Sequence, residues 1–143
     1  MFGLPIGSVM ESKKVLIAPP DTSVSTAAEL MAERKVSAVM VVEDGRLVGI
    51  FTERDAVYRV IAKGFDARTT ALAEVMTPDP RTVTPDESFG YAMLLMHEGG
   101  FRHAPVVENG RPVGIVSARD ALDPEMEEFE VEARRRKDIR RHA

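Results

Sequence analysis

The sequence predicts an α+β protein in which two β-α-β-β-α repeats pack about a pseudo-twofold axis and a charged helix follows at the C-terminus. Two observations carry this prediction. Residues 41–56, VVEDGRLVGIFTERDA, align without a gap on residues 106–121, VVENGRPVGIVSARDA, with 11 of 16 positions identical. In addition, each copy shows the same order of helical and strand-like patterns. The offset of 65 residues is longer than the period of solenoid repeats, roughly 20–50 residues, and indicates two copies of a small domain.

The length of the chain favours docking of the two copies. It has 143 residues, 44% of them hydrophobic, which is enough to bury a core. One copy of about 60 residues would bury little apolar surface alone, so a shared interface is expected. We place the first domain at 8–64, a linker at 65–73, the second domain at 74–132 and a charged helical tail at 133–143.

The first helix of each copy is predicted from a cap and an apolar stripe. Ser23 can cap a helix whose apolar residues recur at i, i+3, i+4 and i+7. The stripe comprises Val24, Ala27, Ala28 and Met31 in the first copy, and Phe89, Ala92, Met93 and Met96 in the second. We interpret both stripes as core.

A hairpin and a second helix complete each repeat. Two β-branched runs, Val39 to Val42 and Leu47 to Phe51, flank Asp44-Gly45, a pair that readily adopts the positive φ angles of a tight turn. Asn109-Gly110 holds the same place in the second copy. The second helices are expected to begin at Thr52 and Ser117, because Ser or Thr followed three residues later by an acid forms a capping box.

The C-terminal segment is predicted to be helical. Asp123-Pro124 suits a helix start. The apolar residues Leu122, Met126, Phe129 and Ala133 follow at 4, 3 and 4 spacing, so this stripe should pack against something. Acidic residues from Glu125 to Glu132 precede basic residues from Arg134 to Arg141, an order that matches the helix dipole. A solvated charged face is one interpretation, and a homodimer contact or an acidic partner is the other.

Composition argues against several classes of function. The chain has no cysteine and three scattered histidines, so we expect no metal site. A net charge of −4 argues against nucleic acid as a partner. No phosphate-binding glycine loop and no nucleophile with its base emerges, so catalytic residues and a cofactor are not expected. With no signal peptide or membrane span in the sequence, we expect a cytoplasmic protein.

The heptads Gly49-Ile50-Phe51-Thr52-Glu53-Arg54-Asp55 and Gly114-Ile115-Val116-Ser117-Ala118-Arg119-Asp120 resemble the CBS-domain family, whose members occur in tandem. The resemblance covers about residues 8–64 and 74–122. It implies a non-catalytic, homodimeric regulatory module that senses energy state by binding an adenosine nucleotide, most simply AMP, ADP or ATP, between its repeats. Such a module relays occupancy to a partner protein. The alternative is a structural dimerisation or protein-interaction module without a ligand.

The resemblance also implies site residues. Asp55 and Asp120 would accept hydrogen bonds from ribose hydroxyls, and Thr52 and Ser117 would lie near phosphate at a helix N-terminus. These residues equally serve as helix caps. Arg54 and Arg119 are further phosphate candidates, or pair with neighbouring acids.

The two copies differ where phosphate charge would be neutralised. Arg102 and His103 precede the second hairpin, where the first copy has Ser37 and Ala38, so the second copy presents cations that the first lacks. The alternative is that both are solvated. Adenine would contact Thr82, Val83, Pro105 and Val106 in the second copy, and Ile17, Ala18, Met40 and Val41 in the first. The first copy departs from the family pattern, with Met40 where proline is usual.

Overall fold

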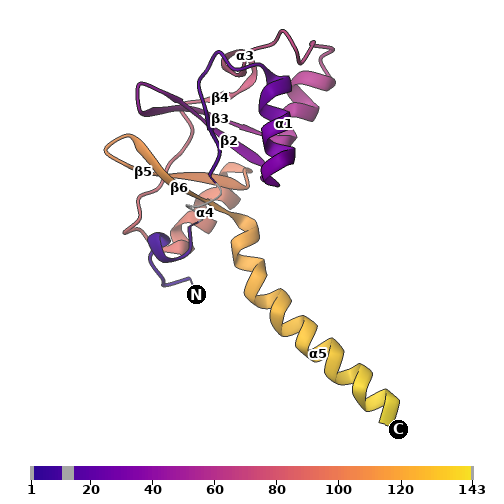
Figure 1. The fold of residues 1–143 in the computed structure, drawn as a ribbon. Helices are drawn as coiled ribbons and strands as arrows, with labels where there is room; N and C mark the ends of the chain where they lie inside the picture. Colours follow the sequence, from indigo (N-terminus) through magenta and orange to yellow (C-terminus); the bar gives the residue numbers. More distant parts are fainter. Residues whose placement is uncertain (1, 11–14, 143) are drawn as a thin grey trace.

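The computed structural model describes residues 2–10 and 15–142, which form two α+β repeats and a long C-terminal helix (Figure 1). In the first repeat, four strands form a sheet in the order β1-β2-β3-β4. The strands are β1 (Ile17–Ala18), β2 (Ala38–Glu43), β3 (Arg46–Thr52) and β4 (Thr77–Pro78). β1 runs parallel to β2, and the other neighbours are antiparallel. β4 comes from the start of the range predicted for the second domain, and this strand was not predicted.

Helices of the first repeat follow the predicted order. α1 (Val24–Arg34) packs against the sheet, and α2 (Glu53–Asp55) continues without a break into the π-helical segment η2 (Ala56–Ile61). A short helix, α3 (Leu72–Val75), precedes β4. The second helix of this repeat therefore begins after Thr52, as predicted.

The second repeat has the same plan with a smaller sheet. It comprises α4 (Phe89–Gly99), the hairpin β5 (His103–Glu108) and β6 (Arg111–Ser117), and the 3₁₀ turn η3 (Ala118–Ala121). The strand that would match β1 is reduced to one parallel bridge between Val83 and Val106. Val83 and Val106 are each 65 positions after Ala18 and Val41, which form the equivalent pair in the first repeat. The parallel strand pairing therefore has the same register in both repeats.

Both hairpin turns have the predicted geometry. Asp44 and Gly45 have φ angles of 53° and 78°, and Asn109 and Gly110 have 54° and 78°. Each hairpin also carries a register shift at the same place, Val41/Val42 and Val106/Val107. The turn dipeptides therefore determine equivalent strand pairing in both copies.

The helix caps and core stripes are confirmed with one exception. Ser23 Oγ accepts a hydrogen bond from Thr26 N at 3.1 Å, and Ser88 Oγ accepts one from Tyr91 N at 3.2 Å. The predicted stripe residues lie in two separate cores, one for each repeat. Ala28 is the exception, because it is exposed on the outer side of α1.

Each repeat is closed by a segment from outside its predicted sequence range. Ile6 N donates to Glu87 O, and Phe89 N donates to Leu4 O, both at 2.8 Å, so residues 2–10, with the turn η1 (Ile6–Ser8), lie on the second repeat. In the same way, Leu72 N donates to Thr22 O at 2.8 Å on the first repeat. Each hydrophobic core therefore includes residues that lie outside the domain boundaries predicted from the sequence.

The C-terminal helix predicted from the sequence is present. α5 (Leu122–His142) begins directly after η3, and Asp123-Pro124 lies in its first turn. A proline is tolerated there because the first turn needs no intrahelical N–H bond. The side chains of Leu122 and Met126 lie outside the described part, and Phe129 and Ala133 are exposed. Within the described residues, the stripe therefore packs on neither repeat.

Replacing Ile6 with alanine should destabilise the second repeat, because Ile6 is fully buried in its core. We expect the free energy of unfolding to fall by about 2–5 kcal/mol in a denaturant titration. Leu4→Ala is the control, since Leu4 is 48% exposed on the same segment. Equal effects of the two variants would contradict a core role for the N-terminal segment.

Candidate functional site

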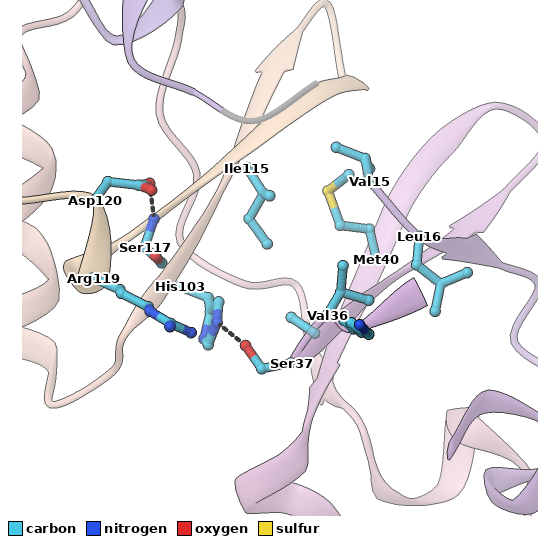
Figure 2. Close-up of a pocket in the computed structure, with 12 residues that line it drawn as sticks. Val15, Leu16, Val36, Ser37, Met40, His103, Ile115, Ser117, Arg119 and Asp120 are labelled. Carbon is cyan, nitrogen blue, oxygen red and sulfur yellow. Dashed lines mark hydrogen bonds between the residues drawn. The ribbon is translucent and has the colours of Figure 1, made fainter. Parts of the chain in front are cut away.

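A cleft of about 310 Å³ lies where the two repeats meet (Figure 2). The first repeat supplies one wall and the second repeat supplies the other. The lining residues are Val15, Leu16, Lys35, Val36, Ser37, Ala38 and Met40 from the first repeat, and His103, Ile115, Ser117, Arg119 and Asp120 from the second. Both repeats therefore contribute apolar side chains and a cation to the cleft, with Lys35 from the first and Arg119 from the second.

A hydrogen bond joins the two repeats at the cleft. The Ser37 hydroxyl and His103 Nε2 are 2.9 Å apart, although the residues are 66 positions apart in sequence. Burial lowers the pKa of His103 below its usual range. The charges of Glu53 and Asp55 oppose this shift and that of Arg102 adds to it. The folded state thus favours the neutral imidazole.

The motif of the second repeat lies at the cleft. β6 ends at Ser117, whose backbone N–H donates to Asp120 Oδ2 at 2.8 Å. Ala118 N donates to Arg102 O at 2.9 Å, which holds the start of η3 against the hairpin. Arg119 is exposed, and Figure 2 shows its side chain extending toward His103. The second repeat therefore presents the Arg119 guanidinium at one side of the cleft.

The motif of the first repeat forms the predicted capping box. Thr52 N donates to Asp55 Oδ2 at 2.9 Å, and Asp55 N donates to Thr52 Oγ1 at 3.3 Å. The other oxygen of Asp55 lies 3.5 Å from Arg59 Nε. Arg54 lies over the ring of Tyr58, 5.3 Å from its centre, instead of pairing with an acid. None of these residues lines the cleft described above.

The sixteen predicted ligand-binding residues are thus divided by the structure. Five line the cleft: Met40, His103, Ser117, Arg119 and Asp120. Four have side chains in the two cores, which leaves only their backbone available to a ligand: Ala18, Val41, Val83 and Val106. The others lie outside this cleft lining, with Ile17, Arg54, Thr82 and Arg102 exposed, Thr52 and Asp55 half-buried and Pro105 buried.

Lys35 is a lining residue that the sequence reasoning missed. It ends α1 with a φ of 56°, in the left-handed region, where the equivalent helix α4 ends at Gly100 with a φ of 70°. A residue with a Cβ costs about 1–2 kcal/mol in this conformation. The alignment itself held the signal, because position 35 matches a glycine at the offset of 65.

Among the side chains that the structure describes, no three His, Asp or Glu residues gather in a group suited to a metal ion. The helices in the described part of the chain also lack the combination of length and apolar character that crossing a bilayer requires.

The duplicated fold and the inter-repeat cleft define a tandem-domain architecture. The sequence profile of the CBS domain matches residues 6–62 and 72–125. The chain belongs to the CBS-domain family and forms a CBS pair.

Relatives and solved structures agree with this assignment. The meiotically up-regulated gene 70 protein of Schizosaccharomyces pombe is 43% identical over 101 residues, which cover 70% of this chain and 14% of that protein. An uncharacterized conserved protein of Pyrococcus horikoshii has a TM-score of 0.80 and 32% identity, covering 87% of this chain and 94% of its own.

A CBS domain pair in complex with 5′-methylthioadenosine and S-adenosyl-L-methionine has a TM-score of 0.76. Its identity is 24%, with coverage of 87% of this chain and 97% of its own, so the likeness concerns the fold. The chain spans only 14–20% of the length of the first curated relatives that it matches.

Acidification should destabilise the protein partly through His103. Because its pKa is lower in the folded state than the ordinary 6.5, the unfolded chain binds more protons as the pH falls below that value. The contribution of neutral His103 to the free energy of unfolding is therefore present above that pH and is lost as the pH falls below it. We expect the melting temperature of the wild type to fall more steeply between about pH 7.5 and 5.5 than that of His103→Gln. His97→Gln, at an exposed site on α4, should keep the wild-type slope, and parallel curves for all three would contradict this role.

Proposed function

We propose that this CBS pair is a non-catalytic regulatory module that binds an adenosine nucleotide in the cleft between its repeats. The observation that carries this proposal is the convergence of Lys35 from one repeat with Arg119 and Asp120 from the other in a single cleft of about 310 Å³. Clefts of roughly 300–1,000 Å³ at domain junctions are typical sites for small ligands.

The chemistry of the lining suits the parts of a nucleotide. Lys35 and Arg119 offer positive charge for phosphate, and an arginine can bind phosphate oxygens with two parallel hydrogen bonds. The apolar wall includes Leu16, Met40 and Ile115, which suits a flat base. The family resemblance supplies the remaining role, that of Asp120 toward the ribose hydroxyls. Two cations favour AMP, ADP or ATP over an uncharged nucleoside.

The strained backbone of Lys35 supports a binding role. Its left-handed conformation carries a cost that glycine would avoid, as Gly100 does in the second repeat. Strain of this kind is found preferentially at functional sites, where the side chain is needed. The cationic side chain at the cleft gives a reason to keep a lysine at this position.

Regulation would follow from binding across the junction. A nucleotide that contacts both repeats stabilises the arrangement in which its two sets of contacts are made together. A partner protein or a second copy that binds one arrangement better than the other would then respond to occupancy. The ligand-bearing CBS pair described above shares this fold, and both of its ligands contain adenosine.

Nucleotide binding should stabilise the folded chain. At 100 times the dissociation constant the stabilisation is about 2.7 kcal/mol, equivalent to a rise of roughly 5 °C in melting temperature. The measurement is a thermal-shift series with AMP, ADP, ATP, NAD and S-adenosylmethionine at millimolar concentration, with adenosine as the control for phosphate. No shift with any of them would refute the proposal.

Replacing Lys35 with glycine should have opposite effects on stability and on binding. The substitution relieves the left-handed strain, so the free energy of unfolding should rise by about 1 kcal/mol. It also removes a phosphate contact, and nucleotide affinity measured by calorimetry should fall by about tenfold or more.

The control is Arg111→Ala, which removes an exposed cation outside the cleft lining and should leave the affinity unchanged. Unchanged nucleotide affinity in Lys35→Gly would exclude Lys35 from the binding site.

A second candidate function is self-association or protein binding without a ligand. The observation in its favour is a group of exposed apolar side chains on and just after η2: Val57, Tyr58, Ile61 and Phe65 are 51–72% exposed. An exposed apolar group of this kind is typical of an interface. We propose that this face supports the homodimer. A chain that self-associates and gives no thermal shift with nucleotides would favour this candidate over the first.

A further inference from the structure

Helix α5 is long and unaccompanied. It comprises 21 residues, Leu122–His142, and extends away from both repeats (Figure 1). The large apolar side chains described on it are open to solvent, with Phe129 70%, Val131 60% and Ile139 62% exposed. In proteins, most of the stability of a helix comes from packing of its apolar face against another element.

The charges of α5 are separated along its axis. Among its described side chains, Glu128, Glu130 and Glu132 precede Ala133, and the consecutive cations 134–137 follow it. One ion pair forms within the helix, between Arg136 Nε and Glu132 Oε1 at 3.3 Å. The helix therefore presents an acidic half and a basic half of nearly equal length.

We propose that α5 pairs in antiparallel orientation with α5 of a second copy of this chain. Antiparallel pairing lays the acidic half of each helix along the basic half of the other and aligns the two helix dipoles favourably. Parallel pairing would lay acid along acid and base along base. The interaction surface is thus complementary to itself about a twofold axis near Ala133, as a symmetric dimer contact requires.

The spacing of two charges identifies the contact. Phe129 and Ala133 are four residues apart and lie on one face of the helix. Glu130 and Lys137 are seven residues apart, about two turns, and therefore lie on the same flank of that face. In an antiparallel pair, the same flank of each helix lies against that flank of the other, and the two sequences run in opposite directions. Glu130 of each copy therefore faces Lys137 of the other. Phe129 is covered by the second helix.

Other partners fit α5 less well. Nucleic acid or an acidic peptide would attract cations 134–137 and repel Glu128, Glu130 and Glu132 on the same helix. A second copy satisfies both halves together. This inference does not depend on the nucleotide cleft.

The test is a charge-reversal cycle on the full chain. For each variant, sedimentation velocity experiments measure the dissociation constant for self-association. Glu130→Lys and Lys137→Glu should each weaken self-association by on the order of tenfold, because each places like charges together at two symmetric contacts. The double variant should restore the wild-type constant. Asp138→Lys is the matched control for Glu130→Lys. It makes the same change in charge, lies well away from the Phe129–Ala133 face, and should have little effect.

Each other outcome would overturn the proposal. A wild-type chain that stays monomeric at about 1 mM, roughly the concentration that a weak contact of 4 kcal/mol requires, excludes the pairing. Single variants that associate as tightly as the wild type, or a double variant no better than the singles, also exclude it. Retained association combined with binding of a DNA oligonucleotide that is lost on Lys137→Glu would assign the basic half to nucleic acid instead.

Discussion

Neither repeat completes its hydrophobic core without a segment from outside its own sequence range, and the rest of the structure depends on this constraint. Ile6 fills the core of the second repeat, and Leu72 and Val75 fill that of the first. The pairing of each segment uses equivalent hydrogen bonds, such as Ile6 N to Glu87 O and Leu72 N to Thr22 O. Residues from outside each repeat therefore complete its core, and this exchange holds the two repeats together. The cleft lies where the repeats meet.

Divergence between the repeats gives the cleft its chemistry. A perfect twofold would place identical residues on both sides, whereas here Lys35 stands where the second repeat has Gly100, and Ala38 stands where it has His103. The hydrogen bond between Ser37 and His103 therefore joins positions that are not equivalent. The two walls of the cleft therefore differ in charge, with Lys35 on one and Arg119 and Asp120 on the other.

The second helices of the two repeats run differently, and one pair of equivalent positions, Arg59 and Pro124, differs there. Arg59 bonds the carbonyl groups of Val75 and Met76 and lies beside Asp55, which ties the second helix of the first repeat to the segment before β4. The equivalent position in the second repeat is Pro124, whose side chain cannot make such bonds. There the helix continues as α5 and leaves the body of the protein.

The sequence by itself determined the duplication, the α+β order, both hairpin turns and the capping box at Thr52, because each depends on residues close together in the chain. It also contained the resemblance that predicted Ser117, Arg119 and Asp120 as site residues. Only the tertiary structure brought Lys35 and Arg119 into the lining of one cleft and placed the side chains of Ala18 and Val106 in the cores. These features depend on how two repeats dock, and docking is decided by surface fit between residues far apart in sequence.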